Sequence, residues 1–397
     1  MKRINIVGVG LGEGTITGDA RQAIAQADVL LGAPRLLNLF KGSHARSYPC
    51  YLPQEVSAIV AKEEAAEFAV LVSGDVGFYS AAIGLTTALA AYQVRLVPGI
   101  STVAAFFARL KLPWQDAVFV STHGRDLAII DTVRRNRLTF CLTGNKVNEI
   151  GAMLGDVGFK KIRAFVGENL GTEDERVYET QLEALAQGDF PSLSVLLLEN
   201  EAFDDTTPVG LPDNCFIRSA TIPLTKSETR AVVLSKLNLR PNFVCWDLGA
   251  GTGSVTVEMA LNAYDGHVYA VERRDEGLSL IKENCAAFKV GNVSLIGGEA
   301  PEVLEALPPP DAVFIGGSGG KVQAILAAVL AKNPRARIVI TAVTIETVAQ
   351  AISKFSALGL EPEIVQLNVA RGRRSGDLHL MQAQNPITIL SVGGDNL

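Results

Sequence analysis

Residues 243–258 constrain the fold most, because they predict a strand, a glycine-rich turn and a helix in direct succession. The apolar run 243–248 leads straight into Gly249, Gly251 and Gly253, which alternate with Ala and Thr. Glycine has no Cβ atom to hold a ligand away from the backbone, and positive φ angles cost it little. The turn therefore suits a nucleoside lying against its backbone.

The next apolar run, 268–271, ends at Glu272, 23 positions after Gly249. An acid at this strand end is placed to accept hydrogen bonds from ribose hydroxyls. A dinucleotide fingerprint needs its third glycine at the position of Ser254, whereas this chain has Gly253 one residue earlier, which disfavours a nicotinamide cofactor. An ordinary tight turn is the alternative, but the position of Glu272 favours an adenosine-bearing cofactor.

The composition indicates a two-domain globular protein. At 397 residues the chain exceeds what one hydrophobic core usually organises. Hydrophobic residues make up 48% and charged residues 20%, and the apolar runs are short, so no segment is expected to span a membrane. The net charge of −6 argues against broad nucleic-acid binding, and the dispersed cysteines and histidines predict no bound metal. The first residues lack a signal-peptide pattern, which predicts a cytoplasmic protein.

A second set of glycine-rich loops occurs in the first half of the chain. The predicted strand 4–7 leads into residues 8–14 (GVGLGEG), and two further apolar runs lead into the small-residue loops 73–79 and 98–102. The alternation of predicted strands and helices indicates an α/β fold. Each loop alone is a weak signal, because glycine after a strand is common.

In combination, these loops resemble those of the tetrapyrrole methylases. Residues 8–14, 74–75, 98–101 and 121–125 carry the resemblance along the whole half. The segments that narrow it to the subgroup that methylates precorrins late in corrin synthesis are 32–35 (GAPR), 142–146 (LTGNK) and 167–171 (GENLG). One departure is that residues 11–14 read LGEG where the family often has a proline, so the loop shape that the proline sets is not implied here.

The resemblance implies an S-adenosylmethionine site in a cleft between two α/β subdomains. His123 and Arg125 are candidates for positioning the substrate, although a hydrogen-bonded loop residue is an equal reading of His123. Arg35 is either a solvated charge or a clamp for a substrate carboxylate. The residues carried over as cofactor contacts are Gly8, Gly10, Gly12, Gly74, Asp75, Val76, Ser101 and Thr102.

The second half resembles the class I S-adenosylmethionine methyltransferases. Residues 247–253 match their Asp-x-Gly-x-Gly-x-Gly loop, and with residues 222–230 they resemble the decarboxylating partner domain of corrin synthesis. Residues 225–228 also fit a helix N-cap pattern beginning at Thr225. The cofactor contacts that this resemblance implies are Thr225, Gly249, Ala250, Gly251, Thr252, Gly253, Glu272, Gly298, Glu299 and Ala300.

In such enzymes the reacting end of the substrate lies beside the loop that corresponds to residues 316–320. Here Ser318 stands among four glycines, with no acid, base or nucleophile, so we expect positioning to carry the chemistry. Arg371, Arg373 and Arg374 are either a solvated turn or a grip for a polycarboxylate substrate. Alternation along an extended segment puts Arg371 and Arg373 on one face, which makes them the stronger pair.

The whole chain thus resembles the fused, bifunctional precorrin-6Y methyltransferases. The resemblance implies a tetrapyrrole methylase domain at 1–203 for carbon-5 methylation, a linker at 204–212, and a class I Rossmann-like domain at 213–397 for carbon-15 methylation and decarboxylation of the C-12 acetate. We expect two S-adenosylmethionine sites per chain, a tetrapyrrole substrate with or without cobalt, and a homo-oligomer. The alternatives are a non-catalytic tetrapyrrole carrier in one half and a nicotinamide-dependent reductase.

Overall fold

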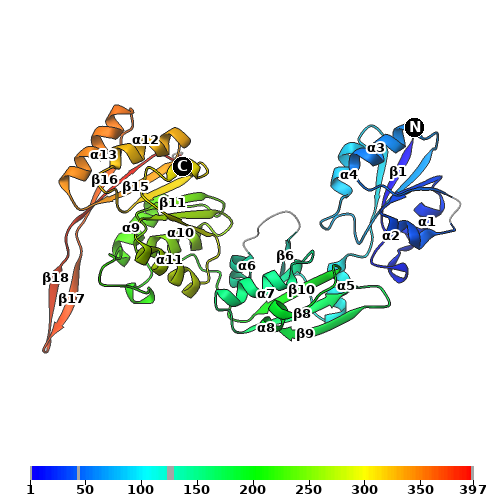
Figure 1. The fold of residues 1–397 in the computed structure, drawn as a ribbon, viewed down its shortest axis with the longest axis horizontal. Helices are drawn as coiled ribbons and strands as arrows, with labels where there is room; N and C mark the ends of the chain where they lie inside the picture. The colour runs from blue at the N-terminus through cyan, green and yellow to red at the C-terminus, as the bar shows by residue number, and fades with distance from the viewer. Residues whose placement is uncertain (1, 43–44, 123–128, 395–397) are drawn as a thin grey trace. The chain divides into compact units, whose positions relative to one another are not determined.

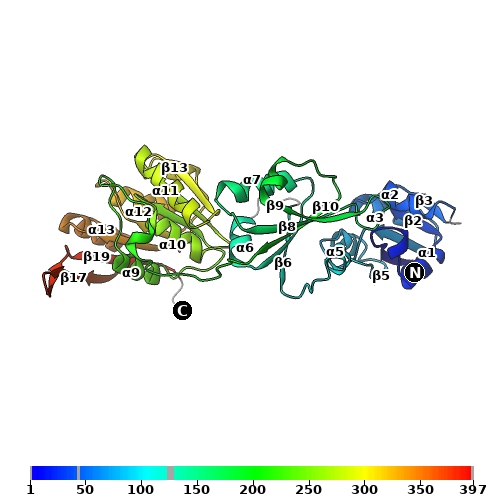
Figure 2. The same cartoon turned by 90° about the horizontal axis from the view of Figure 1, so that it is seen from below.

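The computed structural model describes residues 2–42, 45–122 and 129–394. By its contacts the chain forms two compact units (Figures 1 and 2). Unit 1 comprises Met1–Leu127, Asn136–Ala152 and Lys161–Glu201, and unit 2 comprises Ala128–Arg135, Met153–Lys160 and Ala202–Leu397. In the described ranges, no helix combines the length and the apolarity needed to cross a membrane.

The first sheet of unit 1 is parallel and is covered by helices on both faces. Its strand order is β3-β2-β4-β1-β5. Buried side chains of α1 and α2 pack on one face, and those of α3 and α4 pack on the other. The elements are β1 (Arg3–Gly8), η1 (Glu13–Thr15), α1 (Gly18–Ala25), β2 (Val29–Gly32), α2 (Pro34–Leu37), η2 (Asn38–Phe40), β3 (Arg46–Tyr48), α3 (Pro53–Lys62), β4 (Glu67–Val72), α4 (Ala82–Ala88) and β5 (Gln93–Val97).

The second sheet of unit 1 is mixed, with strand order β6-β7-β10-β8-β9. Only the β6–β7 pair is parallel among its described pairings. Phe106 and Phe107 of α5 pack against Phe140 on this sheet. The elements are α5 (Thr102–Leu110), β6 (Ala117–Ser121), β7 (Leu138–Leu142), α7 (Val147–Asp156), β8 (Ile162–Glu168), β9 (Arg176–Gln181), α8 (Leu182–Gln187) and β10 (Ser194–Asn200).

Helix α6 (Ile129–Arg135) belongs to unit 2, although it lies in the first half of the sequence. The Asp131 carboxylate accepts the N–H of Gly291 at 3.1 Å, and the Arg135 guanidinium lies 3.7 Å from the centre of the Tyr264 ring. Asp131 is buried, and its burial raises its pKa to about 6. The helix is thus held on unit 2 by polar contacts as well as by packing.

The sheet of unit 2 has the strand order β13-β12-β11-β14-β15-β19-β16. Neighbours from β13 to β15 are parallel, and β19 is antiparallel to both β15 and β16. Helices α9, α10 and α11 cover one face, and α12 and α13 cover the other. The elements are η3 (Asp213–Cys215), α9 (Ser227–Leu237), β11 (Val244–Leu248), α10 (Ser254–Asn262), β12 (His267–Glu272), α11 (Asp275–Ala287), β13 (Val293–Gly297), η4 (Leu304–Ala306), β14 (Ala312–Ile315), α12 (Val322–Lys332), β15 (Arg337–Ala342), α13 (Ile345–Ala357), β16 (Glu363–Leu367) and β19 (Ile387–Val392).

A long hairpin, β17 (Ala370–Ser375) and β18 (Leu378–Ala383), extends from unit 2 between β16 and β19 (Figure 1). Arg371 pairs with Gln382 and Arg373 with Leu380, which puts both arginines on one face. The predicted alternation is confirmed.

The predicted cap of α9 is wrong. The helix begins at Ser227 and its N-cap residue is Lys226, not Thr225. The N–H of Ser227 donates to the Asp213 carboxylate at 2.9 Å, so an acid from a distant turn takes the role that Thr225 was expected to have.

Candidate cofactor and substrate sites

A pocket opens in unit 2 at the carboxyl ends of the parallel strands. The loops after β11, β12, β13 and β14 all reach it, as expected for the ligand site of an open α/β sheet. It is lined by Ile222, Pro223, Gly249, Gly251, Val271, Glu272, Arg273, Arg274, Gly298, Glu299, Ala300, Gly316, Gly317, Ser318 and Gly319.

Close backbone packing requires glycine in the loop after β11. Gly249 has φ +76°, and a Cβ atom there would lie 2.8 Å from the amide nitrogen of Gly317. Gly251 has φ +58°, and its Cβ would lie 3.1 Å from the carbonyl oxygen of Pro223. Larger residues would be strained at both positions, and they would also separate the loops that form the pocket wall.

Glu272 fixes this loop from the end of β12. One carboxylate oxygen accepts the N–H of Gly251 at 2.9 Å, and the other accepts those of Arg273 and Arg274, both at 3.0 Å. The residue is 8% exposed. An ionised carboxylate offers about four lone-pair sites, so three backbone donors leave it able to accept a ligand hydroxyl as well.

Residues 221–225, which we call the strap, supply a further wall of the pocket. Ile222 and Pro223 line the pocket. At one end of the strap, the Thr221 hydroxyl donates to Glu276 at 2.6 Å, and its carbonyl accepts from Arg274 at 3.0 Å. At the other end, the Thr225 carbonyl accepts a hydrogen bond from Arg230. The strap is therefore anchored on both sides of the pocket.

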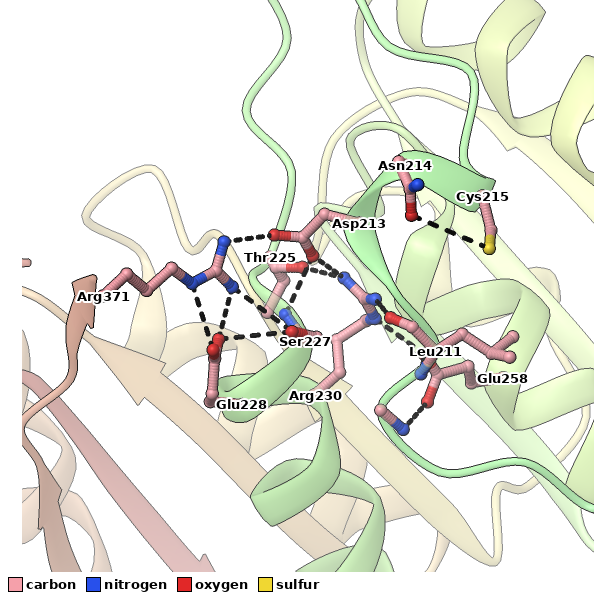
Figure 3. Close-up of polar contacts among 11 residues, drawn as sticks. Leu211, Asp213, Asn214, Cys215, Thr225, Ser227, Glu228, Arg230, Glu258 and Arg371 are labelled. Carbon is pink, nitrogen blue, oxygen red and sulfur yellow. Dashed lines mark hydrogen bonds and ion pairs between the residues drawn. The ribbon is translucent and has the colours of Figure 1, made fainter. Parts of the chain in front are cut away.

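Arg371 and Arg373 of β17 differ in their partners, and Figure 3 shows those of Arg371. Arg371 binds Glu228 through both Nε (3.0 Å) and Nη2 (2.5 Å), and its Nη1 donates to Asp213 at 3.0 Å. This pairing raises the pKa of Arg371 and lowers the pKa of Glu228 to about 2. Among the described residues, Arg373 forms no ion pair. The charge of Arg371 is therefore already matched, whereas that of Arg373 is available to a ligand.

A second pocket lies in unit 1, where loops of the parallel sheet meet loops of the mixed sheet. Arg35 contributes the cation that this pocket presents. The lining residues are Gly10, Leu11, Arg35, Leu36, Leu39, Ser73, Gly74, Asp75, Phe78, Tyr79, Ser101, Thr102, Leu142, Thr143, Leu170, Ser192, Leu193, Ser194 and Val195.

The loops of this second pocket are tied together mainly through backbone groups. Gly10 and Gly74 exchange two N–H···O bonds of 3.1 and 2.8 Å. The Asp75 carboxylate accepts the N–H of Gly77 at 2.7 Å and that of Gly99 at 3.2 Å. The Ser101 hydroxyl caps α5 by accepting from the N–H of Ala104 at 3.1 Å. The three predicted loops after β1, β4 and β5 thus form one cradle.

Comparison with known proteins accounts for both halves. Residues 3–186 match the family model of tetrapyrrole (corrin/porphyrin) methylases, and residues 216–393 match that of a precorrin methyltransferase domain. A precorrin-6Y C(5,15)-methyltransferase (decarboxylating) of Sinorhizobium sp. is 31% identical over an alignment that covers 96% of this chain and 94% of that protein. This chain belongs to the family of decarboxylating precorrin-6Y C(5,15)-methyltransferases.

Other relatives of this methyltransferase match one half only. A probable cobalt-precorrin-6B C(15)-methyltransferase (decarboxylating) of Pyrobaculum calidifontis is 44% identical over 185 residues, which are 46% of this chain and 95% of that protein. The crystal structure of a precorrin-6Y C5,15-methyltransferase from Geobacter metallireducens GS-15 is 36% identical, with a TM-score of 0.45, and covers 47% of this chain and 97% of its own.

The structure divides the expected contacts of the methyltransferase into two groups. Those that line a pocket are Gly10, Gly74, Asp75, Ser101, Thr102, Gly249, Gly251, Glu272, Gly298, Glu299, Ala300 and Ser318. The expected contacts outside these linings are Gly8, Gly12, Val76, Thr225, Ala250, Thr252, Gly253, Arg371 and Arg373. At Gly12 a Cβ would lie 2.2 Å from the carbonyl oxygen of Gly171, so this glycine serves close packing. His123 and Arg125 lie outside the described residues.

Two residues of this methyltransferase had no role assigned from sequence: Asp247, which lies just before the glycine loop of unit 2, and Tyr79, which lines the pocket of unit 1. Asp247 near the end of β11 is buried, and its Oδ2 accepts the Thr256 hydroxyl at 2.5 Å, whereas its Oδ1 has no hydrogen-bond partner in the part of the chain that the structure describes. Burial raises its pKa to about 7. Tyr79 lines the pocket of unit 1 with φ +46°, an uncommon conformation for a non-glycine residue. An acid within an apolar strand is visible in the sequence, whereas the backbone angle of Tyr79 leaves no sequence signal.

Proposed function

We propose that the chain methylates precorrin-6Y at carbons 5 and 15 and removes carbon dioxide from the C-12 acetate side chain, with S-adenosylmethionine as methyl donor. The observation that carries this proposal is the presence of two pockets, each built from strand-end loops of a different α/β sheet, in a chain that aligns almost end to end with a precorrin-6Y C(5,15)-methyltransferase. Residues 1–203 would serve carbon 5 and residues 213–397 would serve carbon 15 and the decarboxylation, joined by 204–212.

Two cofactor sites per chain are part of the proposal. In unit 2, Glu272 lies at the strand end where an acid accepts ribose hydroxyls, and the loop 249–251 offers backbone without side chains. In unit 1, the cradle of Gly10, Gly74 and Asp75 gives a comparable approach to backbone. Both pockets therefore fit an adenosine-bearing ligand on features of this chain.

Positioning is the main contribution of the protein to the C-terminal reaction. S-adenosylmethionine, when bound, supplies a methyl group on a sulfonium sulfur. The loop 316–319 lines the pocket, and its one polar side chain is Ser318, so this loop can orient a nucleophilic ring carbon but offers no acid or base of its own. Val343 and Ile345 follow the neighbouring strand β15 and are 72% and 84% exposed, which gives a flat macrocycle an apolar shelf at the same edge.

Arginines that have no ion-pair partner among the described residues are the candidates for binding the substrate carboxylates. Arg373 on the hairpin and Arg35 in the pocket of unit 1 form no ion pair among the described residues. A guanidinium binds a carboxylate through two parallel hydrogen bonds, which suits a substrate rich in acetate and propionate groups. His123 and Arg125 remain candidates for the first reaction.

A cobalt-containing substrate is a second candidate. The observation that favours it is the similarity of the C-terminal half to proteins named as probable cobalt-precorrin-6B methyltransferases, at 44% identity for the relative from Pyrobaculum calidifontis. Comparing turnover of metal-free and cobalt-loaded substrate by mass spectrometry decides between the two.

A homo-oligomer is also proposed. Leu378, Leu380 and Met381 on the hairpin are 70%, 58% and 69% exposed. Clustered exposed apolar side chains are typical of surfaces that another protein covers. Sedimentation of the full chain, compared with a variant carrying Ser at these positions, measures whether the hairpin supports assembly.

The function can be tested with methyl-labelled S-adenosylmethionine and a variant of the C-terminal pocket. Incubation with precorrin-6Y and methyl-labelled S-adenosylmethionine should add two labelled methyl groups and remove one carbon dioxide. Gly251→Arg should block the C-terminal pocket and leave a singly methylated product that keeps its carboxylate, because the pocket of unit 1 is separate. One methyl group from the unaltered chain, or loss of both methylations in the variant, would contradict the proposal.

A further inference from the structure

The Arg371 side chain ends in a network that continues into the core of unit 2 (Figure 3). Asp213 is the link: its Oδ2 accepts from Arg371 at 3.0 Å, and its Oδ1 accepts from Arg230 at 3.1 Å. Arg230 is fully buried and is paired with the equally buried Glu258 at 2.7 Å. Two guanidinium groups thus share one carboxylate, one from the exposed hairpin and one from the core.

Arg230 holds the strap by its backbone. Its Nη1 donates to the carbonyl of Thr225, and its Nη2 donates to the carbonyl of Leu211. Two residues before Thr225, the carbonyl oxygen of Pro223 approaches Gly251 in the cofactor loop. A shift of the Arg230 guanidinium would therefore move the wall of the cofactor pocket.

We propose that Arg371 is a positioning residue for the C-terminal cofactor site: through Asp213 and Arg230 it holds residues 222–225 against the pocket, and it does not bind substrate carboxylates itself. The inference rests on the proposed S-adenosylmethionine site in unit 2. It gives the hairpin a role in cofactor binding, although the hairpin lies far from the glycine loop in the sequence.

The ion pairs of Arg371 support a role in positioning rather than in binding substrate carboxylates. Arg371 faces two carboxylates, Glu228 and Asp213, and makes a further 3.2 Å hydrogen bond with the Ser227 hydroxyl. A substrate carboxylate would have to displace partners that already satisfy the planar fork. Without Arg371, the partners left to Asp213 among the described residues would be Arg230 and the N–H of Ser227, and Glu228 would lose the cation that it binds. The strap anchor would then be less well fixed.

The test compares Arg371→Ala, Arg371→Lys and the matched control Arg374→Ala in the full chain. Arg374 lies on the opposite face of the same strand, and its described hydrogen bond is to the carbonyl of Gly376 in the adjoining turn. We expect Arg371→Ala to raise the KM for S-adenosylmethionine in carbon-15 methylation by roughly 5- to 10-fold, with less than about a 2-fold change in the KM for the tetrapyrrole. Arg371→Lys should restore part of the loss because it keeps the charge, and Arg374→Ala should have the same KM for S-adenosylmethionine as the unaltered chain.

Hydrogen exchange provides a readout independent of turnover. In the unaltered chain, S-adenosylhomocysteine should protect the peptide that contains residues 221–226, and failure to do so would contradict the proposed cofactor site itself. In Arg371→Ala this peptide should exchange faster before ligand is added. If the variant changed only the tetrapyrrole KM and left exchange of the strap unaltered, Arg371 would be a substrate contact and the inference would be wrong.

A second route covers the case in which Arg371→Ala does not fold. Asp213→Asn keeps the size of the linking side chain but removes the charge that the two arginines share. It should also raise the KM for S-adenosylmethionine, and combining it with Arg371→Lys should add less than the product of the two single effects, because both act through one link. Independent, multiplicative effects would overturn the proposed relay.

Discussion

The two pockets are held in shape by different kinds of interaction. In unit 1, Gly10 and Gly74 pair through their backbones, and the half-buried Asp75 ties two loops. In unit 2, a buried ion pair, Arg230 with Glu258, fixes the strap, and the cofactor loop follows the buried Asp247. Backbone pairing tolerates side-chain change, whereas buried charges depend on every partner. The C-terminal pocket should therefore be the more sensitive of the two to mutation and to pH.

Removing Glu258 tests most directly whether unit 2 depends on its buried charges. Glu258→Ala would remove the buried carboxylate that Arg230 contacts at 2.7 Å and leave Asp213 as its remaining partner acid, and would also free the N–H groups of Gly210 and Leu211. We expect unit 2 to lose about 3–5 kcal/mol of unfolding free energy. Denaturant unfolding followed by the fluorescence of Trp246, which is buried in unit 2, would measure the loss.

Glu175→Ala is the matched change in unit 1. Glu175 pairs with Arg109 at 2.5 Å, but both side chains are partly exposed, at 25% and 35%. An exposed pair contributes only about 0–1 kcal/mol, so this variant should unfold nearly as the unaltered chain does. Equal losses in the two variants would remove the distinction between the units.

The buried acids of unit 2 should make its stability depend on pH. The pKa of Asp247 is raised to about 7 in the folded state, chiefly by burial, from an unfolded value of about 3.9. Between these values the folded state binds more protons than the unfolded state, so stability falls as pH rises. Asp131, with a pKa of about 6, acts in the same direction up to that pH.

Asp247→Asn isolates the contribution of Asp247. We expect the stability of the variant to be less dependent on pH between about 6 and 7, where Asp131 is losing its remaining proton in both proteins, with a difference on the order of 1 kcal/mol across that unit. Thermal unfolding at a series of pH values would show it. Parallel stability curves for the variant and the unaltered chain would mean that Asp247 is ionised throughout.

Glu272→Ala tests how the cofactor loop of unit 2 is held. Loss of the three accepted N–H bonds and of the proposed contact with a ribose should weaken cofactor binding in this unit by about 1–3 kcal/mol. The site of unit 1 should keep its affinity. Two-site calorimetry would resolve the change, and unaltered affinity at both sites would exclude Glu272 from cofactor binding.

The sequence predicts the strand-end loops but not the ion pairs that connect distant segments to them. The sequence predicts that Gly249, Gly251 and Glu272 meet at the end of parallel strands, and all three line the pocket, because a strand, a glycine turn and a terminal acid are local patterns. The shared carboxylate of Asp213 was not predicted, because its partner Arg371 is 158 positions away and ion pairs between distant segments have no periodicity. The cap of α9 was mispredicted for the same reason, since a distant acid replaced the local Thr225.

The smallest expected effect separates Arg373 from Arg371. Arg373 shares the face of Arg371 on β17 but forms no ion pair within the described residues, so its charge is the one that we propose for binding a substrate carboxylate. Arg373→Ala should raise the tetrapyrrole KM of carbon-15 methylation by about 2- to 5-fold, reduce its dependence on salt, and leave the KM for S-adenosylmethionine unchanged. Steady-state kinetics at two ionic strengths would measure both constants. The two arginines lie two residues apart on one strand. If Arg371→Ala raises the KM for S-adenosylmethionine and Arg373→Ala raises that for the tetrapyrrole, the difference comes from the partners of each side chain and not from its position on the hairpin. A rise in the S-adenosylmethionine KM for Arg373→Ala would instead mean that the hairpin affects the cofactor pocket as a rigid unit.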